Sequence, residues 1–293
     1  KDRKELLLQA VQSVLQQTHA PLEIIIVNDG GANHSHALMQ SLAPETPGLH
    51  WLENQGSGRS AAANTALLAA MGEYCLFLDD DDWIDPPHLS NLLHAIQAQS
   101  ENLAAYSSTR TINSDNSIAA ETFDYPFDAT RLLVENYIPI HAALFSRKLI
   151  ELGCRFDTNF DRYEDWDFWL QALAHTNFLH VPECTANYRI ADQSGFGAKF
   201  VEKLTSFRTA LYRKWLPLFS ETQLLSVLDR SRGWLQVAVL NDTLEEQTRF
   251  LKHLQTLIAE MQEELEKRAE CIRKNDEHLE GQARHMQKLT GLI

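Results

Sequence analysis

The sequence predicts an α/β fold in which helices cover both faces of a doubly wound, mainly parallel sheet. Segments with helical spacing of apolar residues alternate with short apolar runs as far as about residue 240. This alternation is typical of βαβ units, which build parallel sheets. The segments 22–31 and 73–80 contain continuous apolar runs, as strands buried on both faces do. A chain of 293 residues is also long enough to bury a large core.

The predicted elements follow one another closely along the first part of the chain. Residues 4–18 place Leu7, Val11 and Leu15 on one face of a helix. The next elements are strand 22–31, helix 35–43, strand 49–54, helix 59–71, strand 73–80, helix 86–99 and strand 103–112. Further helices are predicted at 207–219 and 221–240.

The composition limits the classes of partner and compartment. A net charge of −14 argues against a nucleic-acid partner, because nucleic-acid binders normally carry a basic face. The four cysteines are far apart and form no C-x-x-C pair, which argues against a zinc site or a disulfide framework and favours a reducing compartment. No apolar run approaches the roughly 20 residues of a membrane span. We therefore expect a cytoplasmic protein, with peripheral attachment at the inner face of the membrane as the other option.

The segment CLFLDDDDWIDP, residues 75–86, places four consecutive aspartates directly after an apolar strand. Two unit charges about 4 Å apart repel each other by roughly 4 kcal/mol near a protein surface, so these carboxylates need solvent or a cation between them. Asn28 and Asp29 end another predicted strand. Ligands of such sheets bind beyond the carboxyl ends of the strands, so both strand ends should open onto one crevice. The alternative is a solvated acidic turn whose charges suit the start of the next helix.

Three segments in combination resemble the family 2 glycosyltransferases with the GT-A fold. They are residues 13–31, residues 54–89 with an acidic D-x-D strand end, and residues 163–173 with a Glu-Asp-Trp motif. The resemblance covers about residues 4–195. It implies a Rossmann-like sheet and the transfer of a sugar from a nucleoside diphosphate donor, with inversion, using a divalent metal. Family members begin with a strand that would precede Lys1, so we expect a fragment of a longer protein whose first strand is missing.

On this resemblance, three of the four aspartates would hold the metal. Mg²⁺ and Mn²⁺ prefer carboxylate oxygens and water, and they neutralise the charge of a departing diphosphate. Asp79 would lie near both the ribose and the metal, Asp81 would be the firmest metal contact, and Asp82 would be a supporting acid. Asp80, between them, would belong to the donor site.

The resemblance also implies donor contacts outside the aspartate run. Asp29 would contact the base or ribose of the donor. Asn28 stands where the family usually has Asp, and the alternative for this segment is an Asn-Asp-Gly-Gly turn that needs no ligand. Arg59 and Asn64 fall in the region that lines the donor pocket in the family. The spacing from Asn54 to Asn64 is slightly longer than in the common form, so a surface role for Arg59 at a helix N-terminus is the alternative.

An inverting transfer needs a base that takes the proton of the acceptor hydroxyl. The family uses the Asp of its Glu-Asp motif, which falls on Asp165, with Glu164 orienting the acceptor or the neighbouring loop and Trp166 walling the sugar site. The alternative is structural, because acidic residues suit the first turn of a helix and Trp166 suits a core. His141 lies in a stretch expected to face the acceptor, unless it is a buried structural histidine. Ala191 stands where many relatives have a histidine close to the metal, and Asp192 follows it; either Asp192 substitutes for that histidine or the metal keeps an extra water.

We expect the chain to divide into a GT-A domain at residues 1–198, a helical extension that packs on it at residues 199–240, and a coiled coil at residues 241–293. Apolar residues recur at every seventh position of the last segment, from Leu244 to Ile293. This is a coiled-coil heptad with several polar partner positions. It indicates self-association or a spacer to a further domain. The alternative is a single amphipathic helix folded back on the domain.

Together these features predict a metal-dependent, inverting glycosyltransferase that acts on a glycan or lipid-linked acceptor in the synthesis of a bacterial surface polysaccharide. One rival is a nucleotidyltransferase, but the Gly-rich, basic phosphate loop typical of that class is not visible. The other rival is a non-catalytic sugar-binding scaffold carried on a coiled coil. Asp79, Asp81 and Asp165 argue against the scaffold, because a domain without catalysis has no reason to keep all three acids.

Overall fold

The computed structural model of the chain describes residues 4–20, 22–30, 48–160, 162–190 and 198–233, together with scattered residues between 248 and 273. The chain separates into two compact units, Lys1–Val227 and Leu228–Ile293. The sheets and the candidate site belong to the first unit. The predicted helix 35–43, Asp192 and most of the predicted heptad positions lie outside the described residues.

The N-terminal part contains a small parallel sheet. Its elements are α1 (Lys4–Leu15), β1 (Ile24–Asn28), β2 (Leu49–Glu53) and α3 (Arg59–Ala69). β1 and β2 pair in parallel, from Ile24 opposite Leu49 to Asn28 opposite Glu53. Each of these elements matches a predicted one, with ends shortened by a few residues. The chain therefore brings Asn28 to the carboxyl end of β1, close to the start of α3.

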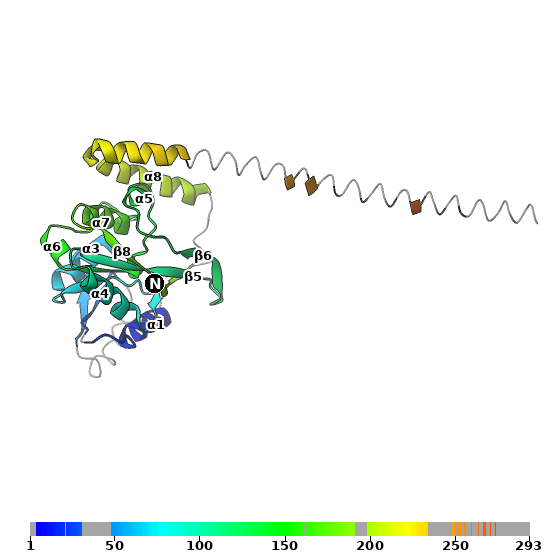
Figure 1. The fold of residues 1–293 in the computed structure, drawn as a ribbon. Coiled ribbons are helices and arrows are strands. Elements are labelled where there is room, and N and C mark those ends of the chain that lie inside the picture. Colours follow the sequence, from blue (N-terminus) through cyan, green and yellow to red (C-terminus); the bar gives the residue numbers. More distant parts are fainter. Residues whose placement is uncertain are drawn as a thin grey trace, which may run out of the picture. The chain divides into compact units, whose positions relative to one another are not determined.

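A second, six-stranded sheet has the strand order β3-β7-β5-β8-β4, with β6 paired to β5 (Figure 1). Its strands and flanking helices are β3 (Tyr74–Leu76), β4 (Trp83–Ile84), α4 (His88–Ala98), β5 (Ala104–Ile112), β6 (Ile118–Phe123), α5 (Ala129–Leu132), the 3-10 helix η2 (Ile140–Ala142), β7 (Ala143–Ser146), α6 (Lys148–Glu151), α7 (Glu164–Leu173) and β8 (Phe178–Arg189).

The α/β class is confirmed, but the strand pairing is more mixed than the sequence predicts. Among the described strands of the larger sheet, only β5 and β8 pair in parallel. The pairs β3–β7, β4–β8, β5–β6 and β5–β7 are antiparallel. A short connection explains the pair β5–β6, because residues 113–117 link them and so short a turn joins only antiparallel strands.

The main core lies between α7 and the larger sheet. Trp166, Phe168 and Trp169 are each at most 1% exposed. The ring of Phe168 stacks on that of Phe156 at 4.7 Å and approaches that of Phe145 at 5.1 Å. Packing of this density fixes the position of α7 over the sheet. The first turn of this helix carries the predicted catalytic acids.

A further helix, α8 (Ala198–Trp215), lies against α7 and is followed by the 3-10 helix η3 (Leu216–Leu218) (Figure 1). The contact is polar at its centre. Trp215 Nε1 donates to Asp167 Oδ1 at 2.8 Å, and Lys214 Nζ lies 2.8 Å from the same oxygen. Asp167 is completely buried, and a buried carboxylate needs a compensating positive charge, which Lys214 of α8 supplies.

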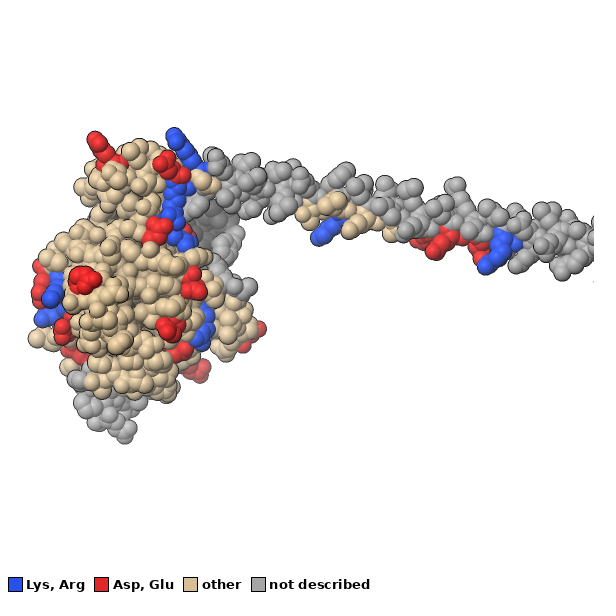
Figure 2. All heavy atoms as spheres, viewed as in Figure 1, with Lys and Arg blue, Asp and Glu red and all other residues tan. Residues whose placement is uncertain are grey.

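The face of the molecule shown in Figure 2 mixes charges of both signs. Lys and Arg side chains lie among Asp and Glu side chains around a mainly uncharged surface. Among the described residues, no helix has both the length and the apolar character needed to cross a membrane.

Candidate active site

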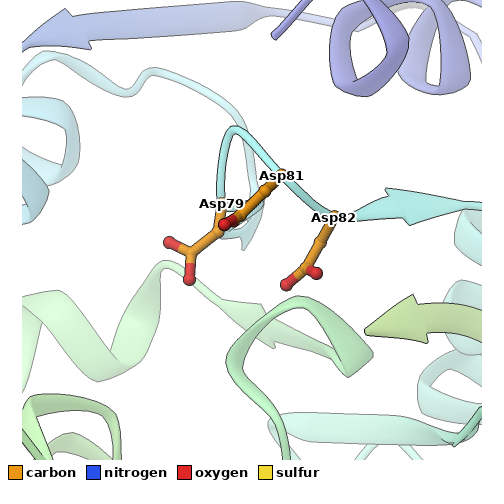
Figure 3. Close-up of side chains that lie close together, drawn as sticks. All are labelled: Asp79, Asp81 and Asp82. Atoms are coloured by element: carbon orange, nitrogen blue, oxygen red, sulfur yellow. The ribbon is translucent and has the colours of Figure 1, made fainter. Parts of the chain in front are cut away.

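The acidic turn lies between β3 and β4. The N–H of Asp82 donates to the carbonyl of Asp79 at 3.2 Å, which closes the turn. Asp79, Asp81 and Asp82 each offer a carboxylate oxygen, and these oxygens all lie within 4.8 Å of one another. Figure 3 shows the three side chains extending from this one turn. Asp80 lies on the same turn, half-buried and outside the group of three.

These three carboxylates suit a divalent cation. Asp82 is 2% exposed, and its Oδ1 accepts a hydrogen bond from Arg189 N at 2.8 Å. Its Oδ2 lies 3.1 Å from His141 Nδ1 without hydrogen-bonding geometry, so a buried carboxylate oxygen retains unused acceptor capacity. Buried polar atoms in this state are rare. A hard cation such as Mg²⁺ or Mn²⁺ would satisfy the oxygen, because these ions prefer carboxylate ligands.

Arg59, the first residue of α3, connects the acidic turn to α7. Its Nη2 lies 2.7 Å from Asp79 Oδ2 and 3.1 Å from Asp79 Oδ1. Its Nε lies 2.9 Å from Glu164 Oε1. The two carboxylates, Asp79 above all, raise the pKa of Arg59 above its ordinary value. The guanidinium group of Arg59 therefore supplies a positive charge beside the acids that follow β3.

Glu164 and Asp165 occupy the first turn of α7, where the helix dipole favours negative charge. Burial and then the neighbouring charge of Asp165 raise the pKa of Glu164 to about 7, and Arg59 opposes this shift only in part. Burial also raises the pKa of Asp165. Asp165 Oδ2 accepts from Asn136 Nδ2 at 3.0 Å and its Oδ1 accepts from its neighbour's backbone N–H at 2.8 Å, which favours the ionised form and orients the carboxylate.

The end of β1 organises the loop that leads to Arg59. Asp29 Oδ1 accepts from Asn54 Nδ2 at 2.6 Å and from Gly58 N at 3.1 Å. Asn28 Nδ2 donates to Glu53 Oε2 at 2.9 Å, across the two parallel strands. Both polar residues thus lie at the strand end where the sequence predicts them, and Asp29 ties that end to the start of α3.

The side chains of Asn64 and Trp166 have hydrogen-bond partners within the protein. The side chain of Asn64 donates to the carbonyl of Phe156 at 2.8 Å and accepts from its N–H at 3.0 Å, so its amide joins two chain segments. Trp166 is 1% exposed and donates from Nε1 to Leu132 O at 2.7 Å. Consecutive residues on a helix point about 100° apart, so Trp166 faces the core although Asp165 does not.

His141 occupies the second of its two predicted positions, that of a buried structural histidine. It is 1% exposed and adjoins Asp82, so it supports the acidic turn from the protein side and presents no surface to an acceptor. β8 supplies two residues that sequence reasoning missed. Arg189 donates from its N–H to Asp82 and from Nε to Asp81 O at 3.2 Å, and Tyr188 precedes it. The segment ANYRI was not predicted to be a strand.

The fold and the acidic turn define a class of protein. Similar solved structures include Staphylococcus aureus TarS residues 1–349 in complex with UDP-GlcNAc, with a TM-score of 0.56 and 14% identity over 70% of this chain and 62% of that one. The mannosyltransferase PcManGT of Pyrobaculum calidifontis, in complex with GDP-Man and Mn²⁺, has a TM-score of 0.60 and 16% identity over 78% of this chain and 65% of that one. The chain thus has the GT-A fold of glycosyltransferases.

The sequence comparison gives the family. The model of glycosyl transferase family 2 matches residues 1–160, and the chain belongs to this family. It is 31% identical over 264 residues to the protein EpsH of Bacillus subtilis (strain 168), covering 85% of this chain and 69% of that protein. It is 25% identical over 179 residues to the chondroitin synthase of Pasteurella multocida (strain Pm70), covering 61% of this chain. The chain spans only 18% of the length of that synthase.

Proposed function

We propose that the chain transfers a sugar from a nucleoside diphosphate sugar to a hydroxyl group of a glycan or lipid-linked acceptor, with inversion at the anomeric carbon and in dependence on Mn²⁺ or Mg²⁺. One observation carries the proposal: Arg59 bridges the acidic turn and the first turn of α7, so that Asp79 and Glu164 lie on either side of one guanidinium group. A donor diphosphate at the turn and an acceptor at α7 would therefore be neighbours.

On the donor side, Asp79, Asp81 and Asp82 would hold the cation, with Asp80 beside them. A bound Mn²⁺ or Mg²⁺ supplies charge neutralisation for the departing diphosphate. Arg59 can serve the same phosphates, because its planar guanidinium binds phosphate oxygens in pairs. Asn28 and Asp29, at the end of β1, would contact the nucleoside.

On the acceptor side, Asp165 would act as the base. The acceptor oxygen forms a bond to the anomeric carbon from the face opposite the diphosphate, the bond to the diphosphate oxygen breaks, and Asp165 takes the hydroxyl proton. The hydrogen bonds from Asn136 and the N–H of Trp166 hold its carboxylate in one orientation. Glu164, held by Arg59, would orient the acceptor.

The relatives support a place for this reaction in the synthesis of a bacterial polysaccharide. Chondroitin synthase and hyaluronan synthase, both from Pasteurella multocida, are among the relatives. We further propose that the protein works in the cytoplasm or at the inner face of the membrane, and that residues 241–293 associate with a second copy or space a further domain.

The test is thermal unfolding of the chain with UDP, GDP, dTDP and CDP, each with and without Mn²⁺. A ligand that binds the native state raises its apparent stability by mass action. We expect a rise in melting temperature that needs both Mn²⁺ and one of the nucleotides. A cooperative transition that no nucleotide moves would overturn the proposal in favour of a scaffold.

A variant then distinguishes binding from catalysis. Asp165→Asn keeps the size of the side chain but replaces one of its two acceptor oxygens with an NH2 group and is not a base, so we expect transfer to fall by about a hundredfold or more while nucleotide binding persists. Turnover that survives the substitution would assign the base elsewhere.

A further inference from the structure

Tyr188 lies next to the acidic turn because β8 passes it. Arg189, the following residue, donates its backbone N–H to Asp82 Oδ1 at 2.8 Å. Side chains alternate along a strand, and the preceding Asn187 is 1% exposed whereas Tyr188 is 40% exposed. The tyrosine therefore points to the open side of the strand at the level of the carboxylates.

The ring of Tyr188 is held on one side by protein. The ring of His141 lies nearly parallel to it, with centroids 5.9 Å apart and planes 15° apart. His141 is buried against Asp82, so its contacts inside the protein fix its position. Phe123, in β6, approaches Tyr188 edge-on at 6.3 Å and 82°. The tyrosine thus has a defined orientation and keeps an exposed part of its surface.

The charges around the phenol agree with this position. Burial raises the pKa of Tyr188, and the negative charges of Asp82, Asp79, Asp165 and Asp81 add to the shift in that order. These four residues include both the acids of the turn and the proposed base. Tyr188 therefore lies within electrostatic range of both reacting ends of the site.

We propose that Tyr188 is the surface on which the transferred sugar of the donor packs. This inference rests on the proposed function. A sugar that leaves a diphosphate at the acidic turn and joins a hydroxyl at Asp165 must pass through the space between them. An aromatic ring offers a rigid apolar surface to the C–H groups of a sugar ring, and binding pockets are typically lined in this way.

The competing explanation is that Tyr188 only fills the space above His141. A filler of that kind would contribute to stability and to the shape of the whole site, so its loss would affect every ligand alike. A sugar contact affects only ligands that carry the sugar. The two explanations therefore differ in the ratio of two affinities.

The experiment measures that ratio by calorimetry with Mn²⁺ present. Wild type, Tyr188→Phe and Tyr188→Ala are each titrated with UDP, UDP-GlcNAc, GDP and GDP-mannose. We expect Tyr188→Ala to weaken binding of a nucleotide sugar by about tenfold, the loss typical of one missing apolar contact, while the matching nucleoside diphosphate binds as before. Tyr188→Phe, which keeps the ring, should bind both ligands like wild type.

The control is Tyr125→Ala, since this tyrosine is 37% exposed but its ring faces the guanidinium of Arg131 at 3.6 Å. It should leave all four affinities unchanged. Tyr188→Leu replaces Tyr188→Ala if the smaller side chain prevents folding, because leucine still covers His141.

Equal losses for nucleoside diphosphate and nucleotide sugar, or no loss for either, would overturn the role of Tyr188 and leave the proposed function intact. A wild-type chain that binds none of the four ligands, and neither dTDP nor CDP, would overturn the proposed function and this inference with it.

Discussion

At the scale of single residues, the site depends on how its negative charges are compensated. Arg59 contacts Asp79 and Glu164, and Asp165 adds to the same field. A guanidinium is always charged, so it can stabilise these carboxylates at any pH at which the protein is folded. Its place among the acids also means that a metal ion and Arg59 compete for Asp79.

Arg59→Gln tests this compensation. Asp79 and Glu164 lose their counter-charge, so we expect the free energy of unfolding in EDTA to fall by about 1 kcal/mol, a modest value because the arginine side chain is half exposed. Mn²⁺ should then stabilise the variant more than wild type. Urea unfolding with and without Mn²⁺ measures both effects. Arg147→Gln, which breaks an exposed 3.8 Å pair with Glu151, is the matched control and should change neither quantity appreciably.

Glu164 predicts a dependence of stability on pH. Its native pKa is about 7 against an ordinary value of 4.5, so between these values the native state holds a proton that the unfolded chain releases. Stability from this group is present below pH 4.5 and is lost as pH rises to about 7. The loss amounts to at most about 3 kcal/mol.

Urea unfolding at pH 5 and pH 8 in EDTA, for wild type and Glu164→Gln, measures this loss. Titrating groups that do not interact with Glu164 cancel in the comparison. Wild type should lose more stability between the two pH values than the variant does. An equal change in the free energy of unfolding between pH 5 and pH 8 for the two proteins would contradict the raised pKa of Glu164.

At the scale of elements, α7 links chemistry to packing. Its first turn carries Glu164 and Asp165, and its next residues, Trp166 to Trp169, are buried in the core or held by α8. Asp167, in the same helix, pairs with Lys214 and Trp215 of α8. The position of the proposed base therefore depends on a polar contact on the far side of the helix.

Lys214→Met tests this contact. It leaves the completely buried Asp167 without its cation, and loss of one partner from a buried pair is costly, so we expect about 2–4 kcal/mol of destabilisation. Urea unfolding measures it. Arg213→Met, one residue earlier and exposed, is the control and should stay near wild type. Equal stabilities for the two variants would show that the pair does not hold α8.

The elements differ in how far the sequence could predict them. α1, β1, β2, α3, β3, α4 and β5 each follow a predicted segment, because their apolar spacing and their Gly, Pro or Asp boundaries are local signals. β7 and β8 were not predicted. They pair with strands such as β3 and β5, which lie far from them in the sequence, and local patterns do not encode such pairing.

At the scale of the whole molecule, the first unit holds the candidate site and the second contains the predicted coiled coil. Leu251 is one of the predicted heptad positions that the structure describes, and it is helical and 59% exposed in this single chain. An exposed apolar heptad position is expected if a partner helix covers it.

Deletion of residues 241–293 tests self-association. The full chain should elute as an oligomer in size-exclusion chromatography with light scattering, and the shortened chain as a monomer. Because the residues of the acidic turn and of the first turn of α7 belong to the first unit, nucleotide binding with Mn²⁺ should be the same in both. A full chain that stays monomeric at high concentration would favour the single amphipathic helix.

The sequence by itself determined the fold class, the family resemblance, the acidic turn and the pair Glu164–Asp165, because each depends on residues that are close together in the chain. Only the tertiary structure decided which of the neighbouring residues face the site. The side chain of Asn64 forms hydrogen bonds with the backbone of Phe156, 92 residues away, and that of Asp82 accepts one from the backbone of Arg189, 107 residues away. The direction of a side chain depends on the rotation of its helix or strand against such distant partners, and no local pattern of residues contains that information.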